Sequence, residues 1–108
     1  MIKRAVLKIK HRKILDKMSN LEISYSALNN YKKCVHGNIV EDDSTLRKKL
    51  RRNFVLGTDE NNFTKRYGNL YIYYQGNLIT NIYNQKGKSD GLNIDKKLKR
   101  DLDYLLGL

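Results

Sequence analysis

Four residues of this sequence have the side-chain chemistry that RNA cleavage without a metal requires. His11 lies in the basic run KIKHRK, whose cations are expected to lower its pKa and keep the imidazole able to accept a proton. Arg66, Thr80 and Tyr83 lie in RYGNLYIYYQGNLITNIYN, the most aromatic stretch of the chain. The reaction needs a base for the ribose 2′-hydroxyl, a cation for the phosphorane and a proton donor for the leaving oxygen. These residues can supply all three.

A second set of residues is expected to bind RNA rather than to react with it. The chain has 22 Lys and Arg residues against 11 acids, and its formal charge of +11 favours phosphate-rich partners. Tyrosines on a sheet can stack on the bases of a single strand with little sequence preference. The residues expected to contact RNA are Lys10, Arg12, Lys13, Arg47, Lys48, Arg51, Arg52, Lys65, Tyr71 and Tyr73. The same charge also fits an acidic protein partner, or a biased composition without functional meaning.

Each candidate also has a purely structural interpretation. His11 falls on the apolar side of a predicted helix, where a partly buried histidine is an equally simple explanation. Tyrosine is a strong strand former, so sheet packing alone can explain the aromatic stretch. Cys34 is interpreted as a small half-buried residue rather than a nucleophile, and His36 as a turn residue. One cysteine and two histidines have no metal-site spacing, so no metal or other cofactor is expected.

The apolar pattern predicts a single α+β domain, with N-terminal helices packed on a small antiparallel sheet and a C-terminal helix. Helices are predicted over residues 8–18, 25–33, 45–52 and about 94–106. Strands are predicted over 54–56, 69–74 and 78–83, the last two forming a hairpin around Gly76-Asn77. AVLKI at the start fits an edge strand or the first turn of a helix. Residues 58–64 are predicted to form a polar turn, and residues 86–91 a loop.

The turn length of this hairpin decides which side chains share a face of the sheet. A three-residue turn groups the tyrosines of the first strand with the odd-numbered residues of the second: Tyr71, Tyr73, Ile79, Asn81 and Tyr83. A two-residue turn groups them with the even-numbered residues instead: Leu78, Thr80 and Ile82. Both registers leave tyrosines exposed or half-exposed on one face.

No apolar run approaches the roughly 18 residues that a membrane-spanning helix needs, so no membrane partner is expected. The basic N-terminal region lacks the apolar segment of a signal peptide. A single cysteine fits a reducing compartment. The expected location is therefore the cytoplasm, or the cytoplasm of a target cell into which the protein is delivered.

The segment HRKILDKMSNLEIS, a second short helix and the hairpin RYGNLYIYYQGNLITNIYN together resemble the small toxin ribonucleases of the barnase–EndoU–colicin–RelE superfamily. The resemblance is one of pattern and covers residues 11–83. It implies that His11 is the helix histidine, Arg66 the cation entering the hairpin and Thr80 the late-strand hydroxyl. It implies Tyr83 as an acid or a stacking group, and requires Thr80 to lie beside His11.

This resemblance implies a metal-independent RNA endonuclease, a toxin module that cleaves tRNA or mRNA through attack of the 2′-hydroxyl. Its partners would be RNA and an acidic immunity or antitoxin protein. The residues leave open a second class, a non-catalytic basic nucleic-acid-binding protein or a phage-type interaction or inhibitor protein. The run LRKKLRR favours this second class, because its cations surround a helix instead of converging on a cleft.

Overall fold

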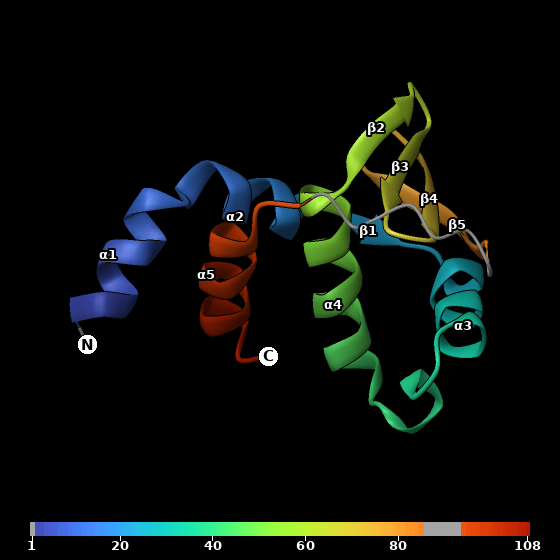
Figure 1. Ribbon diagram of the computed structural model, residues 1–108, viewed down its shortest axis with the longest axis horizontal. Coiled ribbons are helices and arrows are strands. Elements are labelled where there is room, and N and C mark those ends of the chain that lie inside the picture. The colour runs from blue at the N-terminus through green and yellow to red at the C-terminus, as the bar shows by residue number, and fades with distance from the viewer. Residues whose placement is uncertain (1, 86–93) are drawn as a thin grey trace.

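The structure is a computed structural model that describes residues 2–85 and 94–108, and it confirms the α+β class (Figure 1). The described helices are α1 (Ile2–Lys10), α2 (Arg12–Asn20), α3 (Tyr25–Cys34), the short 3₁₀ helix η1 (Asn38–Val40), α4 (Asp43–Leu56) and α5 (Lys96–Leu106). The described strands are β1 (Glu22–Ile23), β2 (Thr58–Asn61), β3 (Thr64–Tyr67), β4 (Leu70–Gln75) and β5 (Leu78–Asn84). The predicted loop at residues 86–91 lies outside the described residues.

The strands form one sheet in the order β1-β5-β4-β3-β2. Strands β2 to β5 make an antiparallel meander, which agrees with the antiparallel sheet predicted although β2 and β3 themselves were not, while β1 pairs in parallel with the start of β5. The mixed sheet was not predicted, because a strand of two residues has too few side chains to show an alternating pattern. Beyond β1, α3 runs along the edge of β5, where Asn84 Nδ2 donates to the carbonyl of Cys34 at 2.7 Å.

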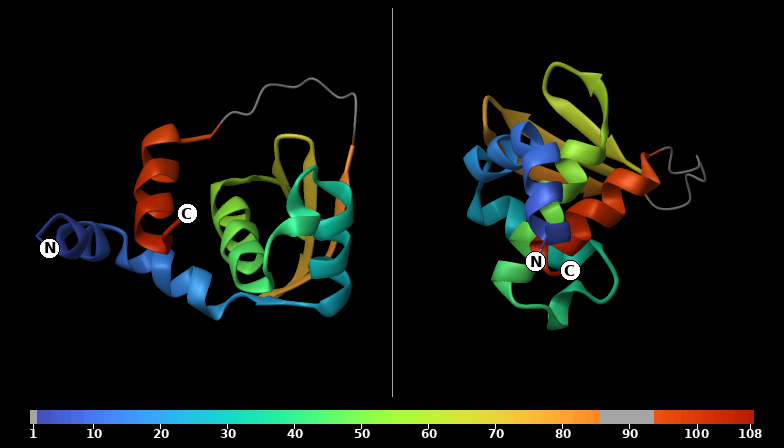
Figure 2. Two further views of the ribbon diagram at one scale, coloured as in Figure 1. Left: turned by 90° about the horizontal axis from the view of Figure 1, so that it is seen from below. Right: turned by 90° about the vertical axis from the view of Figure 1, so that its left-hand side faces the viewer.

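Two apolar clusters hold the layers together. The larger one lies between the sheet and the helices α3 and α4, and its fully buried members include Leu28, Leu46, Leu50, Ile72 and Ile79. The smaller one joins α2, α4 and α5 through Met18, Leu56 and Leu102. As a result α4 lies between α5 and the sheet, which Figure 1 and the left view of Figure 2 both show.

The N-terminal region is helical, but the single helix predicted over 8–18 is wrong in one respect. The helix breaks at His11, whose backbone angles are φ −107° and ψ 22°, and a second helix begins at Arg12. The break lets α1 pack against α5 while α2 packs against α4. It also leaves the N-terminal AVLKI segment in α1, so the strand alternative for this segment is wrong.

The region between α4 and the hairpin differs most from the prediction. Residues 54–56 are not a strand, because α4 continues through them: Leu46, Leu50 and Phe54 recur every four residues and bury one helical face. Residues 58–64 are not only a turn, since they contain β2 and the start of β3. All four residues of β2 are exposed, so no apolar alternation marks it in the sequence.

The predicted β4–β5 hairpin is confirmed, and a bulge sets its faces. Gln75 pairs with Leu78 around the two-residue turn, and Tyr74 pairs with Ile79. The next pair joins Tyr73 to Asn81, so Thr80 is an extra residue without a partner in the ladder. The pairing of the two-residue turn therefore holds only as far as Ile79. From Asn81 onward the residues follow the alternation expected for the three-residue turn.

Candidate nucleic-acid interface

Three of the predicted residues form a row across the face of the sheet that is turned away from the core. Arg66 on β3 pairs with Tyr71 on β4, and Tyr71 pairs with Tyr83 on β5. The guanidinium carbon of Arg66 is 5.6 Å from the centroid of the Tyr71 ring. The Tyr71 and Tyr83 ring centroids are 6.4 Å apart, with 37° between the ring planes. Tyr73 lies on the same face two residues along β4, and we call these four residues the tyrosine face.

The tyrosine face is accessible because strand alternation sends the apolar residues to the other side. Ile72 and Ile82, the neighbours of Tyr71 and Tyr83, pair with each other and lie in the core. On the tyrosine face, Tyr83 is 54% exposed and Tyr73 is 36% exposed. Exposed aromatic rings beside a cation are suited to stacking on nucleobases and contacting the backbone between them.

Arg66 is held in place rather than free to move on this face. Its Nε donates to the carbonyl of Gly68 at 2.9 Å, and its Nη1 lies 3.8 Å from Oε1 of Glu60. The side chain is only 17% exposed. A guanidinium fixed in this way loses little conformational entropy when it binds a phosphate.

Thr80 does not present a free hydroxyl to the tyrosine face. Its Oγ1 donates to the carbonyl of Tyr73 at 3.3 Å, across the bulge. Its own carbonyl accepts a hydrogen bond of 3.1 Å from Oγ of Ser24, the residue that also caps α3. These bonds give Thr80 a structural role at the bulge.

His11 lies in a second cluster, at the junction of α1 and α2. Its Nε2 donates to Oδ2 of Asp101 on α5 at 2.8 Å, and its side chain is 11% exposed. The hydrogen bond from His11 lowers the pKa of Asp101, and the nearby charge of Lys10 lowers it further. A surface hollow of about 510 Å³, which we call the basic hollow, is lined by residues 9–14, which include the predicted cations Lys10, Arg12 and Lys13.

The structure does not bring His11 and Thr80 together. His11 contacts α5, whereas Thr80 contacts the start of α3, and α4 lies between α5 and the sheet (Figures 1 and 2). The four residues proposed for catalysis therefore do not form one site. Arg66 and Tyr83 belong to the tyrosine face, His11 to the basic hollow, and Thr80 to the bulge of β5.

The predicted cations of α4 also divide into two kinds. Arg51 Nε donates to the carbonyl of Leu21 at 3.1 Å, and Arg52 Nη1 donates to Oδ1 of Asp103 at 2.9 Å. Both arginines therefore connect α4 to neighbouring segments. Lys48 is exposed and Arg47 half-buried, so these two are the better placed to meet a ligand.

Lys65 lies on the opposite side of the sheet from its neighbour Arg66. Its ammonium group contacts Oδ1 of Asp59 at 2.8 Å and stands 5.5 Å from the centroid of the Phe54 ring. It therefore belongs to neither the tyrosine face nor the basic hollow.

Sequence reasoning missed Asp101, the partner of His11. The two residues are 90 positions apart, and only the packing of α5 against the first helices brings them together. An aspartate on the polar side of the predicted C-terminal helix was the sole available signal.

Comparison of the chain with protein-family models, curated proteins and solved structures gives no match. Within the described residues, no helix combines the length and the apolar character needed to cross a membrane.

Proposed function

We propose that the protein binds single-stranded RNA on the tyrosine face. The observation that supports this proposal best is the row formed by Arg66, Tyr71 and Tyr83, in which a fixed guanidinium and two rings lie side by side. Bases of a single strand stack on the exposed rings, and Arg66 contacts a phosphate between them. The excess of cations raises the association rate and makes the affinity fall with salt.

The test is binding of a fluorescently labelled single-stranded RNA, followed by anisotropy at several salt concentrations. The Tyr71→Ala/Tyr83→Ala double variant is expected to bind much more weakly than the wild type. Tyr104→Ala is the matched control, because Tyr104 is 42% exposed and lies on α5, which α4 separates from the sheet. Equal affinity of the double variant and the wild type would overturn the proposal. Tighter binding of single-stranded DNA would overturn the assignment to RNA.

A second candidate function, metal-independent cleavage of RNA, is favoured by the pair of His11 and Asp101. A carboxylate bonded to one ring nitrogen orients an imidazole and stabilises the imidazolium that forms when the other nitrogen takes a proton. The carboxylate is Asp101, so Nδ1 of His11 is the nitrogen proposed to deprotonate the 2′-hydroxyl. Lys10, Arg12 and Lys13 line the same hollow and supply the charge that the phosphorane needs.

This candidate is tested by incubating RNA with the protein in EDTA and analysing the product ends. Cleavage is expected to leave 2′,3′-cyclic phosphates and to fall about 10²-fold to 10⁴-fold in His11→Ala. Thr80→Ala is expected to retain activity, since Thr80 lies at the bulge of β5 and not in the basic hollow. Loss of activity in Thr80→Ala but not in His11→Ala would contradict the assignment.

Both activities require access to RNA, so the proposed place of action is a cytoplasm, either of the producing cell or of a target cell. The resemblance to toxin ribonucleases further suggests an acidic immunity or antitoxin protein as a partner. The exposed cations of the basic hollow are a suitable surface for such a partner. Arrest of bacterial growth on expression, relieved by an acidic protein encoded next to this one, would support this extension.

A further inference from the structure

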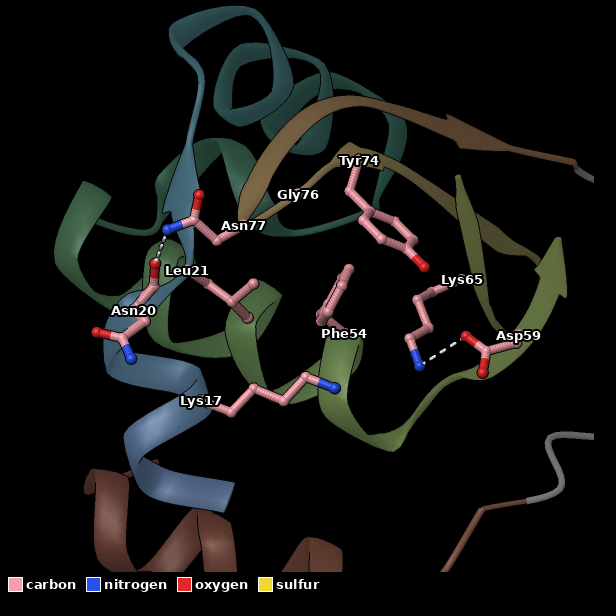
Figure 3. Close-up of a pocket in the computed structure, with 9 residues that line it drawn as sticks. All are labelled: Lys17, Asn20, Leu21, Phe54, Asp59, Lys65, Tyr74, Gly76 and Asn77. Atoms are coloured by element: carbon pink, nitrogen blue, oxygen red, sulfur yellow. Dashed lines mark hydrogen bonds and ion pairs between the residues drawn. The ribbon is translucent and has the colours of Figure 1, made fainter. Parts of the chain in front are cut away.

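A cavity of about 560 Å³ lies on the side of the sheet opposite the tyrosine face (Figure 3). Its walls come from the end of α2, the end of α4, β2, β3 and the turn between β4 and β5. Neither of the activities proposed above uses it. Its lining combines two lysines, an aspartate and a tyrosine with an apolar floor of Leu21 and Phe54.

Two ammonium groups from different elements converge on this floor. The Nζ atom of Lys17 on α2 is 5.9 Å from the centroid of the Phe54 ring, and Nζ of Lys65 on β3 is 5.5 Å from the same centroid. Phe54 itself is only 2% exposed. Two like charges beside one buried ring repel each other, and the apolar floor screens them less than water does. An anion placed between them relieves that repulsion.

Lys65 is fixed in position, which prepares it to bind. Its side chain is 12% exposed, and its ammonium group is bonded to the carboxylate of Asp59 at 2.8 Å. This bond, together with the charges of Lys65 and Lys17, lowers the pKa of Asp59. Asp59 is 68% exposed, so water weakens its repulsion of an incoming anion. An ammonium group has three donors, and the bond to Asp59 uses one.

The hydroxyl of Tyr74 adds an uncharged hydrogen-bond donor to the two ammonium groups of the cavity. The ring of Tyr74 packs edge-on against Phe54, with 4.9 Å between the centroids, and its hydroxyl faces the cavity beside Lys65 (Figure 3). On the far wall the amide of Asn77 donates to the carbonyl of Asn20 at 2.8 Å, which holds the hairpin turn against the end of α2. This hydrogen bond therefore connects the turn that follows Tyr74 with the end of the helix that carries Lys17.

We propose that this cavity binds a phosphomonoester, held by the ammonium groups of Lys17 and Lys65 and by the hydroxyl of Tyr74. A phosphomonoester carries nearly two negative charges at neutral pH, so it is attracted more strongly than the single charge of a phosphodiester. The cavity is larger than a phosphate group, and the remaining space takes the sugar that bears it. The source is either a free mononucleotide or the terminal phosphate of an RNA. The second source rests on the RNA binding proposed above and adds to it recognition of the strand end.

The experiment compares three probes with the wild-type protein: inorganic phosphate, adenosine 5′-monophosphate, and one RNA sequence prepared with a 5′-phosphate or a 5′-hydroxyl. Amide chemical shifts of the residues that line the cavity report occupancy, and anisotropy reports affinity for the RNA. The 5′-phosphorylated RNA is expected to bind about ten-fold or more tightly than the hydroxyl form. Lys17→Ala and Tyr74→Phe are expected to remove most of this difference while leaving affinity for the hydroxyl form nearly unchanged.

Lys48→Ala is the matched control, because it removes the same charge from an exposed position on α4. It is expected to weaken both RNA forms equally and to keep the phosphate preference. Phosphate-induced shifts at the cavity without any RNA binding would support the phosphomonoester site and overturn the proposed function. RNA binding that depends on the tyrosine face but ignores the terminal phosphate, with no shifts from phosphate or mononucleotide, would overturn the phosphomonoester site alone.

Discussion

Tyr71 and Tyr83 are direct cross-strand partners, and their rings lie 6.4 Å apart on the face of the sheet that is turned away from the core. Arg66 extends the row on the adjacent strand, 5.6 Å from the Tyr71 ring. Ile72 and Ile82 pack in the core on the other side of the sheet, whereas core packing does not determine which side chains occupy the tyrosine face. Cross-strand aromatic pairs also stabilise a sheet, so the proposal that these rings stack on bases rests on their position beside Arg66 and on the exposure of Tyr83.

Substitutions of Tyr83 separate stacking from proton donation. Tyr83→Ala is expected to weaken RNA binding by about five-fold to a hundred-fold, because stacking of one base contributes about 1–3 kcal/mol. Tyr83→Phe keeps the ring and is expected to bind nearly as well as the wild type. Anisotropy titrations measure both. A Phe variant that binds as weakly as the Ala variant would show that the hydroxyl, not the ring, makes the contact.

Gly57 sets the distance between the end of α4 and the strand that carries Arg66. A Cβ atom at this position would stand 2.9 Å from the carbonyl oxygen of Arg66 and 3.1 Å from that of Asn53. Both neighbours are backbone atoms that cannot swing away. Gly57→Ala is therefore expected to lower the free energy of unfolding by about 1–3 kcal/mol, measured by urea denaturation. It is also expected to weaken RNA binding, since the strand must shift.

Ser19→Ala is a suitable control for Gly57→Ala, because Ser19 is exposed and bonds only within its own turn of helix. Unchanged stability of Gly57→Ala would mean that the strand moves without cost. The close approach would then not fix the position of Arg66.

The contact between Arg52 and Asp103 joins α4 to α5 and is largely shielded from water. The two side chains are 12% and 22% exposed, and Arg52 also donates to the side chain of Asn53. Asp103→Ala is expected to lower the free energy of unfolding by about 1–3 kcal/mol, because it leaves a half-buried guanidinium without its carboxylate. Asp16→Ala removes an exposed carboxylate from α2 and is expected to change stability little. Equal stabilities of the two variants would contradict a role for Asp103 in holding the helices together.

Two carboxylates of α5 predict how stability depends on pH. The hydrogen bond from His11 lowers the pKa of Asp101, and bonds from Lys99 and Arg52 lower the pKa of Asp103 although burial alone would raise it. Folded protein therefore binds fewer protons than unfolded protein in acid. The stabilisation is complete above about pH 5 and is lost as the pH falls through the ordinary aspartate pKa of about 3.9 toward the lower folded values.

Urea denaturation across the acid range measures this dependence. The Asp101→Asn/Asp103→Asn double variant is expected to be less stable than the wild type at neutral pH and to lose less stability on acidification. Parallel curves for the two proteins would show that other carboxylates control the acid transition.

The sequence was sufficient for those parts of the fold that local patterns determine. Apolar residues recurring at helical spacing located α3 and α5, acids ahead of the basic run LRKKLRR located the first part of α4, and alternating strands around Gly76-Asn77 located the hairpin. It was insufficient where an element lacks an apolar face, as in β2, or is too short to show one, as in β1. The end of α4 was assigned to a strand because Phe54 begins a run of three apolar residues, and periodicity cannot separate such a run from a buried helix end.

The candidate site was predictable in composition but not in arrangement. The hairpin pattern placed Tyr71 and Tyr83 on one face for one of the two possible turn lengths, but β3, the strand that carries Arg66, was not predicted. The separation of His11 from Thr80 could not be predicted, since it depends on how α4 packs between α5 and the sheet. The same holds for the cavity at Lys17 and Lys65, whose two cations come from segments far apart in the chain.

The extra residue at Thr80 is compatible with the two faces of β5 only because the strand bulges around it. Replacing the Thr80 side chain loses the hydrogen bond of its hydroxyl, whereas its backbone carbonyl still accepts from Ser24. Deleting Thr80 would place Asn81 directly after Ile79, so the pairs Tyr74–Ile79 and Tyr73–Asn81 would follow one another in a regular ladder and Tyr83 would stay opposite Tyr71. A regular ladder that kept Thr80 would instead turn Ile82 toward water and Tyr83 into the core. Related chains that lack this one residue would therefore keep the same outer face and the same interior.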